Sequence, residues 1–342
     1  MCGLAGLGIG CAVAPACPKA LLRRPPSEPG AAAPPPRSPL DSWNLRSSVR
    51  NRPHPQLGPA DDAAFPAGLV PVARHPLVLE APPDVRRRTL ARHLFRYLHF
   101  TAVLEHLVVN RTALAFAHQV SGFTVPDRMR LDAFKIYCDE AYHALVAAEL
   151  ATAVAEREGL QVDWTATPYF LRRLGRLVED AGPELAPVVE LLFVVCSETL
   201  ISGTLSQAAE APSLSAPVRQ AIGDHAHDER RHHAYFAELL ERLWPQLTPS
   251  AQRRAGVVVP DLIDAFLRPD LEDYATELRG YGFGADDVAQ ILAESYPDAV
   301  VAADRRHMAR HTVRYFAQVG ALEDPATEGA FVASGLLAGA TA

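Results

Sequence analysis

The chain lacks any apolar run of the length needed to cross a lipid bilayer, which is about 20 residues. It also lacks blocks of like charge, since its 33 basic residues are interspersed with 40 acidic ones and its net charge is only −7. The five cysteines have no paired spacing, which is typical of proteins that fold without disulfides in a reducing compartment. These absences predict a cytoplasmic protein that binds neither membranes nor nucleic acids.

Strand-like alternation and internal repeats are absent too, and proline is confined largely to one end. Residues 1–83 hold 17 of the 29 prolines, a density that cannot sustain long helices. We therefore expect 1–83 to be a disordered or extended arm. Residues 84–320 should form one helical domain, and the Gly/Ala-rich residues 321–342 should form a flexible tail.

From residue 84 onward, apolar residues recur with helical periodicity. This pattern, with its Pro and Gly punctuation, predicts an all-α chain. The expected helices span about 84–119, 126–158, 167–181, 184–209, 215–243, 249–266, 270–279, 285–294 and 296–318.

The most informative segment is His-x-x-x-Glu-x-x-His, formed by His225, Glu229 and His232. On an α-helix, Glu229 lies about 40° to one side of His225 and His232 about 20° to the other, so all three project from one narrow stripe. A second unit, Glu140 and His143, has the spacing Glu-x-x-His. Two Glu-x-x-His units on separate helices are typical of a carboxylate-bridged site for two metal ions in a helical bundle.

Such a bundle also needs one carboxylate from each of two further helices. Glu105 and Glu198 occupy apolar stretches of the first and third core helices, where an ionised carboxylate is costly unless it is paired or bound to metal. Taken alone, either residue is more often a surface group or part of an ion pair. The joint pattern on four helices predicts that all seven side chains are metal ligands.

Asp139 and Asp228 each precede a ligand Glu, so that Asp-Glu-x-x-His occurs twice. Each aspartate lies at the edge of the ligand stripe. We predict that it accepts the second N–H of a ligand histidine from another helix, although an ordinary surface acid is the alternative.

This pattern resembles the bacterial p-aminobenzoate N-oxygenases, over about residues 85–318 and without the proline-rich arm. Glu105, Glu140/His143, Glu198 and His225/Glu229/His232 fill the family's ligand positions in order. The resemblance implies a ferritin-like bundle with additional C-terminal helices, two iron ions, and O2 as co-substrate. It further implies oxidation of an amine, of the arylamine class, to hydroxylamine, nitroso and nitro products in antibiotic or other secondary-metabolite biosynthesis. The resemblance also implies a homodimer and an external electron donor, such as a ferredoxin with its reductase.

The residues that bind substrate are less well marked. Tyr97, about two helical turns before Glu105, and Ser202, one turn after Glu198, are candidates for the pocket. Arg305 or Arg306 could supply a guanidinium for a substrate carboxylate, or could simply be surface residues. Because one metal core supports several outcomes, a di-iron oxygenase acting at carbon remains an alternative, as does a ferritin-type iron-binding protein. Composition does not exclude manganese in place of iron.

Overall fold

The computed structural model describes residues 13–23, 37–58, 64–211 and 213–338, and within α7 the side chains at 202–204, 206 and 207 lie outside the description. Every regular element in these ranges is a helix, and an isolated β-bridge joins Leu22 to Leu247. The prediction of an all-α fold is therefore confirmed. In the described chain, no helix is both long and apolar enough to cross a membrane.

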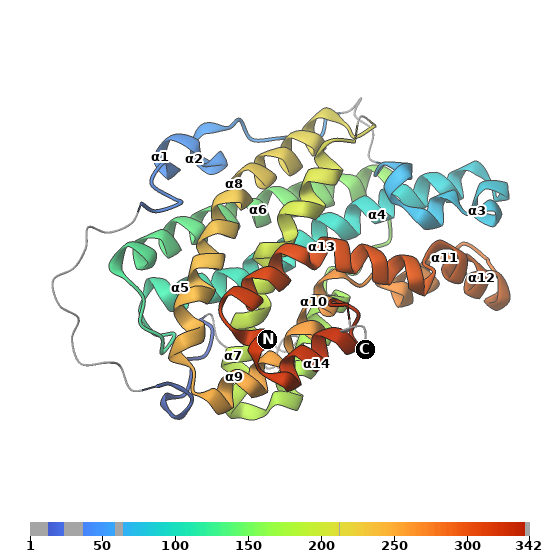
Figure 1. The fold of residues 1–342 in the computed structure, drawn as a ribbon. Coiled ribbons are helices and arrows are strands. Elements are labelled where there is room, and N and C mark those ends of the chain that lie inside the picture. The colour runs from blue at the N-terminus through green and yellow to red at the C-terminus, as the bar shows by residue number, and fades with distance from the viewer. Residues whose placement is uncertain (1–12, 24–36, 59–63, 212, 339–342) are drawn as a thin grey trace.

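Four long helical segments form the centre of the molecule, and Figure 1 shows them running alongside one another. Helix α4 packs on α6, and α7 packs on α8. The first segment is not one regular helix, because a π-helical turn separates α4 from α5. The bounds are α4 Pro83–Leu104, π-turn Glu105–Val109, α5 Asn110–Ala117, α6 Asp127–Glu158, α7 Tyr169–Ala209 and α8 Ala216–Leu243.

Proline and glycine set the limits of these helices as the sequence predicts. Helix α6 follows Pro126 and ends at Gly159, whose φ of 59° is the left-handed conformation of a helix C-cap. Within α7, Gly182 has a φ of 76° and breaks the helix just before Pro183. The two predicted helices 167–181 and 184–209 are thus consecutive parts of one kinked segment.

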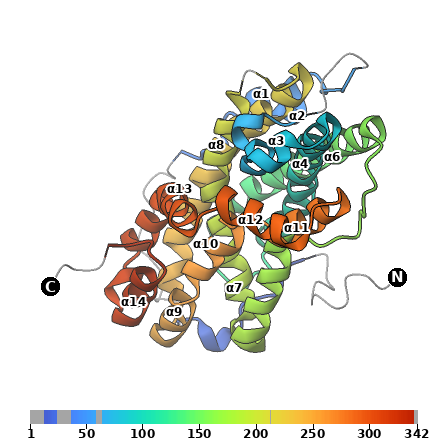
Figure 2. The same cartoon turned by 90° about the vertical axis from the view of Figure 1, so that its right-hand side faces the viewer.

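The C-terminal third adds shorter helices, which cover one side of the bundle in Figure 2. The predicted helix 249–266 is divided in two at residues 257–258. The bounds are α9 Pro249–Gly256, α10 Val259–Leu267, α11 Leu271–Gly280, α12 Ala285–Ser295 and α13 Asp298–Gln318, with 3-10 turns at Trp244–Gln246 and Ala321–Glu323.

A further helix, α14 (Pro325–Ala333), lies where the sequence suggested a flexible tail. The Asp324 side chain accepts hydrogen bonds from the backbone N–H groups of Ala326 and Thr327, which caps the helix. Phe331 is fully buried, with its ring 6.4 Å from that of Phe316 in α13. Capping and burial of one aromatic ring order a segment whose Gly/Ala-rich composition gave little sign of structure.

The described part of the N-terminal arm contains short helical turns joined by extended residues. Several of these turns begin with proline at the first helical position, where its missing N–H costs nothing. Helices α1 and α2 lie next to α6 and α8, at the upper left of Figure 1. The bounds are η2 Lys19–Leu21, α1 Trp43–Arg46, α2 Ser48–Asn51, η3 Ala67–Leu69, η4 Pro71–Arg74 and α3 Pro76–Glu80.

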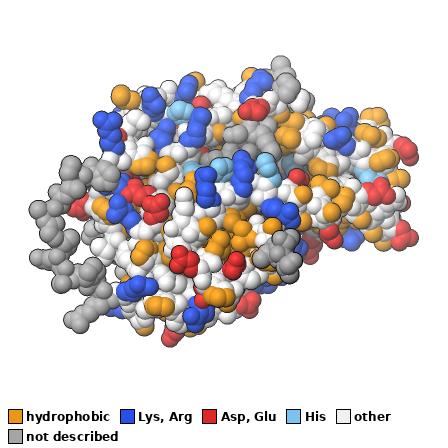
Figure 3. Space-filling view, in the orientation of Figure 1, with side chains coloured by type: hydrophobic (Ala, Val, Ile, Leu, Met, Phe, Trp, Pro, Cys, Tyr) orange, Lys and Arg blue, Asp and Glu red, His pale blue; other side chains and the backbone are white. Residues whose placement is uncertain are grey.

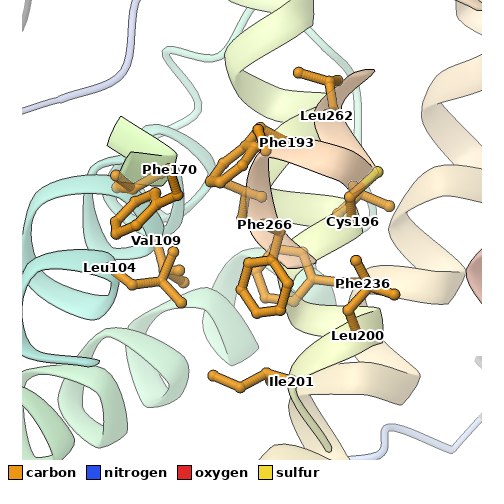
Figure 4. Close-up of a cluster of buried hydrophobic side chains, with 14 of the residues drawn as sticks. Leu104, Val109, Phe170, Phe193, Cys196, Leu200, Ile201, Phe236, Leu262 and Phe266 are labelled. Carbon is orange, nitrogen blue, oxygen red and sulfur yellow. The ribbon is translucent and has the colours of Figure 1, made fainter. Parts of the chain in front are cut away.

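The apolar core joins the long helices to α10. Figure 4 shows side chains of α4, the π-turn, α7, α8 and α10 pointing toward one another, with Cys196 and Leu200 on the same stretch of α7 as Glu198. Outside this core, charged side chains of both signs occur on the face seen in Figure 3, with basic groups along α13. The core therefore buries the stretch of α7 that carries Glu198, and this side chain has no exposed surface.

Candidate metal centre

The four long helical segments bring the seven predicted ligand residues together inside the bundle. All seven are buried, and the four glutamates and His232 have no exposed surface. The π-turn supplies Glu105, α6 supplies Glu140 and His143, α7 supplies Glu198, and α8 supplies His225, Glu229 and His232.

The π-turn is a local feature that helical periodicity alone could not reveal. It begins at Glu105 and ends at Val109, and both residues are buried. A π-turn inserts one extra residue into a helix and is frequent at functional sites, since it re-aims a side chain without ending the helix. Here it occurs where the first helix presents its carboxylate.

The ligand atoms fall into two groups, in each of which they lie within 4.8 Å of one another. One group consists of Glu140, His143, His225 and Glu229, and the other of Glu140, Glu198, Glu229 and His232. Glu140 and Glu229 belong to both groups. Two carboxylates shared in this way are placed to bridge two cations, one in each group.

Glu105 lies beside the first group, with Oε1 3.5 Å from His225 Nε2. Among the side chains that the structure describes, neither carboxylate oxygen of Glu105 and neither of Glu198 has a hydrogen-bond partner, and all four oxygens are buried. Leaving a carboxylate in such a position is costly, and a cation would remove the cost. Oxygen and imidazole ligands of this kind suit iron or manganese, so the side chains present fit a two-metal centre.

The histidines are oriented by carboxylates outside the two groups. His143 Nε2 is 3.1 Å from Asp228 Oδ2, and His232 Nε2 is 3.1 Å from Asp139 Oδ2. Both rings therefore direct Nδ1 to the centre, where His232 Nδ1 is 2.7 Å from Glu140 Oε1. These are the hydrogen bonds that the repeated Asp-Glu-x-x-His motif predicts, and each fixes the tautomer of its histidine.

His225 has the opposite orientation. Its Nε2 faces the centre, 3.2 Å from Glu229 Oε1, and its ring lies 4.0 Å from that of His143. His225 therefore faces the centre through Nε2, whereas His143 and His232 face it through Nδ1.

In the absence of metal, protons balance part of the negative charge. Burial and the charge of Glu140 raise the pKa of Glu105 to about 7. Burial and the charge of Glu229 raise the pKa of Glu198 well above its ordinary value. Burial would lower the pKa of His232, but the charges of Glu140 and Glu229 outweigh it and raise that pKa well above normal. Metal binding would have to displace these protons.

The sequence did not identify the residues that hold the two aspartates. Trp43 Nε1 donates to Asp139 Oδ2 at 2.8 Å, and the backbone N–H of Ser48 donates to Asp228 Oδ2 at 3.1 Å. Arg231 also forms a buried ion pair with Asp228. No spacing rule links these donors to the aspartates, which lie 96 and 180 residues further along the chain.

Tyr97 stands between the centre and a large cavity. It lines a recess of about 30 Å³ that also includes His143 and His225. It also lines a neighbouring cavity of about 560 Å³, and its buried hydroxyl has no hydrogen-bond partner among the described residues. Burial and the charge of Glu105 raise the pKa of Tyr97, so that it remains a neutral donor.

The other predicted substrate residues are Arg305 or Arg306 and Ser202. Arg305 lines the 560 Å³ cavity, but its guanidinium pairs with Asp264 and donates to the Ser334 carbonyl. Arg306 is exposed and donates to the Gly335 carbonyl at 2.6 Å. Ser202 lies in α7, but its side chain is outside the described part of the structure.

Paired Glu-x-x-His motifs and two lone glutamates on four helices define the class of carboxylate-bridged two-metal proteins. A family model described as P-aminobenzoate N-oxygenase AurF matches residues 38–320. A 4-aminobenzoate N-oxygenase from Streptomyces thioluteus is 24% identical over 229 residues, which are 66% of this chain and 68% of the relative. The chain therefore belongs to the p-aminobenzoate N-oxygenase family and is an oxidoreductase of the N-oxygenase type. The match begins at residue 38, so it includes part of the arm that the sequence resemblance left out.

Proposed function

We propose that this protein is a di-iron N-oxygenase that uses O2 to oxidise an aromatic amine to a hydroxylamine, nitroso or nitro product. The observation that supports this most directly is the pair of ligand groups that share Glu140 and Glu229. Two irons held by these groups would supply the electrons and the open coordination positions that activation of O2 requires. The seven ligand residues named above are proposed to hold them.

The protein's own contribution is charge balance, orientation and exclusion of water. Four glutamates offset the charge of two divalent cations, and Asp139 and Asp228 hold two of the histidine rings in place. The carboxylates have no exposed surface, so water reaches the reacting atoms only through cavities. A dry, preorganised site protects a reactive oxidant from side reactions.

We propose that the amine occupies the 560 Å³ cavity and reaches the centre past Tyr97. The volume falls in the range typical of pockets for drug-sized ligands, so the cavity has room for an amine with more than one ring. Six aromatic side chains line its wall, which favours stacking with an aryl substrate. They are Phe65, Tyr97, Phe100, Phe266, Tyr274 and Tyr296.

Both arginines in the described wall of this cavity already have carboxylate partners. Arg96 pairs with Asp273 and Glu277, and Arg305 pairs with Asp264. A substrate carboxylate would therefore meet guanidinium groups whose charge is already balanced. We therefore propose that ring contacts and the Tyr97 hydroxyl, rather than an arginine, provide most of the recognition.

The remaining parts of the proposal follow the family resemblance. One oxygen atom of O2 is transferred to the amine nitrogen and the other leaves as water, with electrons from an external donor such as a ferredoxin and its reductase. We propose that the protein acts as a homodimer in the cytoplasm, in a secondary-metabolite pathway.

Product analysis tests the proposal. Protein loaded anaerobically with Fe(II) is mixed with O2, a reductant and either 4-aminobenzoate or a neutral two-ring aniline, and the products are identified by mass spectrometry. Oxidation at nitrogen, with more product from the two-ring aniline, is the expected result. Products oxygenated only at carbon would instead favour a di-iron oxygenase of a different reaction type, and uptake of many irons per chain would favour a ferritin-type protein.

A further inference from the structure

The N-terminal segment 38–58 contacts both aspartates that orient the ligand histidines. The indole N–H of Trp43, in α1, donates to Asp139 Oδ2, the same oxygen that lies 3.1 Å from His232 Nε2. The backbone N–H of Ser48, the first residue of α2, donates to Asp228 Oδ2, which lies 3.1 Å from His143 Nε2. Two separate chains of hydrogen bonds therefore run from one segment to the two ligand groups.

The two chains serve different groups. His143 belongs to the group of Glu140, His225 and Glu229, whereas His232 belongs to the group that contains Glu198. Trp43 thus donates to the aspartate behind His232, in the second group, and Ser48 to the aspartate behind His143, in the first. A general packing contact has no reason to place one donor on each chain.

Burial makes these contacts strong. Asp139 and Asp228 have no exposed surface, and Ser48 is 1% exposed. A hydrogen bond to a buried charged group contributes more than one in water. Loss of the Trp43 donor would leave Asp139 with His232, and loss of the Ser48 donor would leave Asp228 with His143 and Arg231. The second oxygen of Asp139 is buried without a partner, so Trp43 and His232 are the described donors that this carboxylate has.

We propose that the segment 38–58 is a structural part of the metal centre, in which Trp43 and the Ser48 N–H are positioning residues for His232 and His143 respectively. Each donor fixes the orientation of its aspartate, and the aspartate fixes the ring and tautomer of the ligand histidine. The segment thereby sets the metal affinity of the two groups independently. This inference rests on the proposed two-metal centre.

The chain allows substitutions that remove each donor with little other change. Trp43→Phe keeps an aromatic ring but has no indole N–H. Ser48→Pro removes the backbone N–H, and proline is tolerated here because Ser48 is the first helical residue and Ser47 is extended, with φ −67° and ψ 142°. Ser48→Ala is the matched control, because it keeps the N–H and loses only the hydroxyl bond to the Asp224 carbonyl. Trp164→Phe is the control for loss of an indole, since Trp164 is 45% exposed and meets Phe95 edge to face.

The test is stepwise anaerobic binding of Fe(II) to the full chain, in competition with a chromogenic chelator. Loss of a direct hydrogen-bond partner of a ligand typically weakens metal binding about 10- to 100-fold. Because Trp43 and Ser48 act one step further out, we expect Trp43→Phe to weaken one of the two equivalents about fivefold to tenfold, and Ser48→Pro to weaken the other by a similar factor. The double variant should weaken both. The two controls should bind as the parent does.

Three results would overturn the inference: unchanged affinities in Trp43→Phe, equal weakening of both equivalents in that variant, or weakening by the controls. Equal weakening is what a general loss of stability produces. If Ser48→Pro does not fold, as judged by circular dichroism, Trp43→Phe still decides the matter. A parent chain that fails to bind two equivalents would contradict the proposed function itself, so the two failures are distinguishable.

Discussion

Glu198 provides the sharpest test of whether this centre is built for metal or for structure. Its side chain has no exposed surface, and within the described part of the chain neither carboxylate oxygen has a hydrogen-bond partner. Each buried polar group left in that state costs about 1–3 kcal/mol, and a charged one costs more. We predict that Glu198→Leu stabilises the metal-free protein by about 1–3 kcal/mol, because leucine removes a buried carboxyl group that has no described partner and lies beside the carboxylates of Glu140 and Glu229.

The metal-loaded protein should respond in the opposite direction. A ligand that binds only the folded state at 100 times its Kd stabilises that state by about 2.7 kcal/mol, and loss of a ligand residue removes much of this gain. Urea unfolding of both forms at pH 7 measures the two effects. As a control, Glu184→Leu, just after the kink in the same helix α7, should change neither form by more than about 0.5 kcal/mol, since the Glu184 side chain is 73% exposed.

The gain should also depend on pH with a definite sign. Burial raises the pKa of Glu198 above its ordinary value of 4.5. When folding raises the pKa of a carboxyl group, the folded state binds the proton more tightly than the unfolded state does, so stability falls as the pH rises. The metal-free parent should therefore lose stability as the pH rises above 4.5. The advantage of Glu198→Leu should therefore be larger at pH 7 than at pH 4.5. A metal-free variant that is less stable than the parent at pH 7 would refute the reasoning and make Glu198 a structural residue.

Three further predictions concern protons, the substrate cavity and the backbone. Burial lowers the pKa values of His143 and His232, but neighbouring carboxylates outweigh it and hold both pKa values well above normal. Fe(II) affinity should therefore rise with pH, and binding should release protons, which calorimetry in buffers of different ionisation enthalpy measures. Binding without proton release would contradict this prediction. Tyr97→Phe should raise the KM for the amine about fivefold to tenfold while changing kcat less, because one hydrogen bond to substrate is lost. An unchanged KM would show that Tyr97 does not bind the substrate. Gly122→Ala should lower the free energy of unfolding in urea by about 2 kcal/mol or more, since φ is 84° and the added Cβ would lie 2.6 Å from a backbone oxygen. Gly159→Ala, where φ is 59° and the space is open, should lower it by about 1 kcal/mol. Equal losses in the two variants would contradict the steric argument.

The sequence predicted the features that depend on local spacing. Helical periodicity, together with Pro126, Gly159 and Gly182, marked the long helices and their ends. Residues three or four apart on a helix share a face, so the stripe of His225 and its neighbours was readable as a metal motif. The same spacing placed Asp139 and Asp228 where they could meet histidines of another helix, as their hydrogen bonds show.

Features that depend on distant contacts were not readable. A π-turn shifts the register by one residue without changing the apolar pattern, so nothing around Glu105 announced it. Trp43 lies in a proline-rich segment with no periodicity, and its partner is 96 residues away. Arg305 was correctly placed as a basic residue of α13, but its pairing with Asp264 follows from how α10 and α13 pack. Helix α14 depends on one cap and one buried ring.

The central claim is that this bundle holds two metal ions through shared carboxylates, and anaerobic titration with Fe(II) tests it most directly. The parent should bind two equivalents per chain. Glu229→Ala should bind fewer than two, because Glu229 belongs to both ligand groups, and His225→Ala should lose iron from the first group. Glu241→Ala, an exposed position on the same helix, should retain both. Two equivalents retained in both ligand variants would contradict the account.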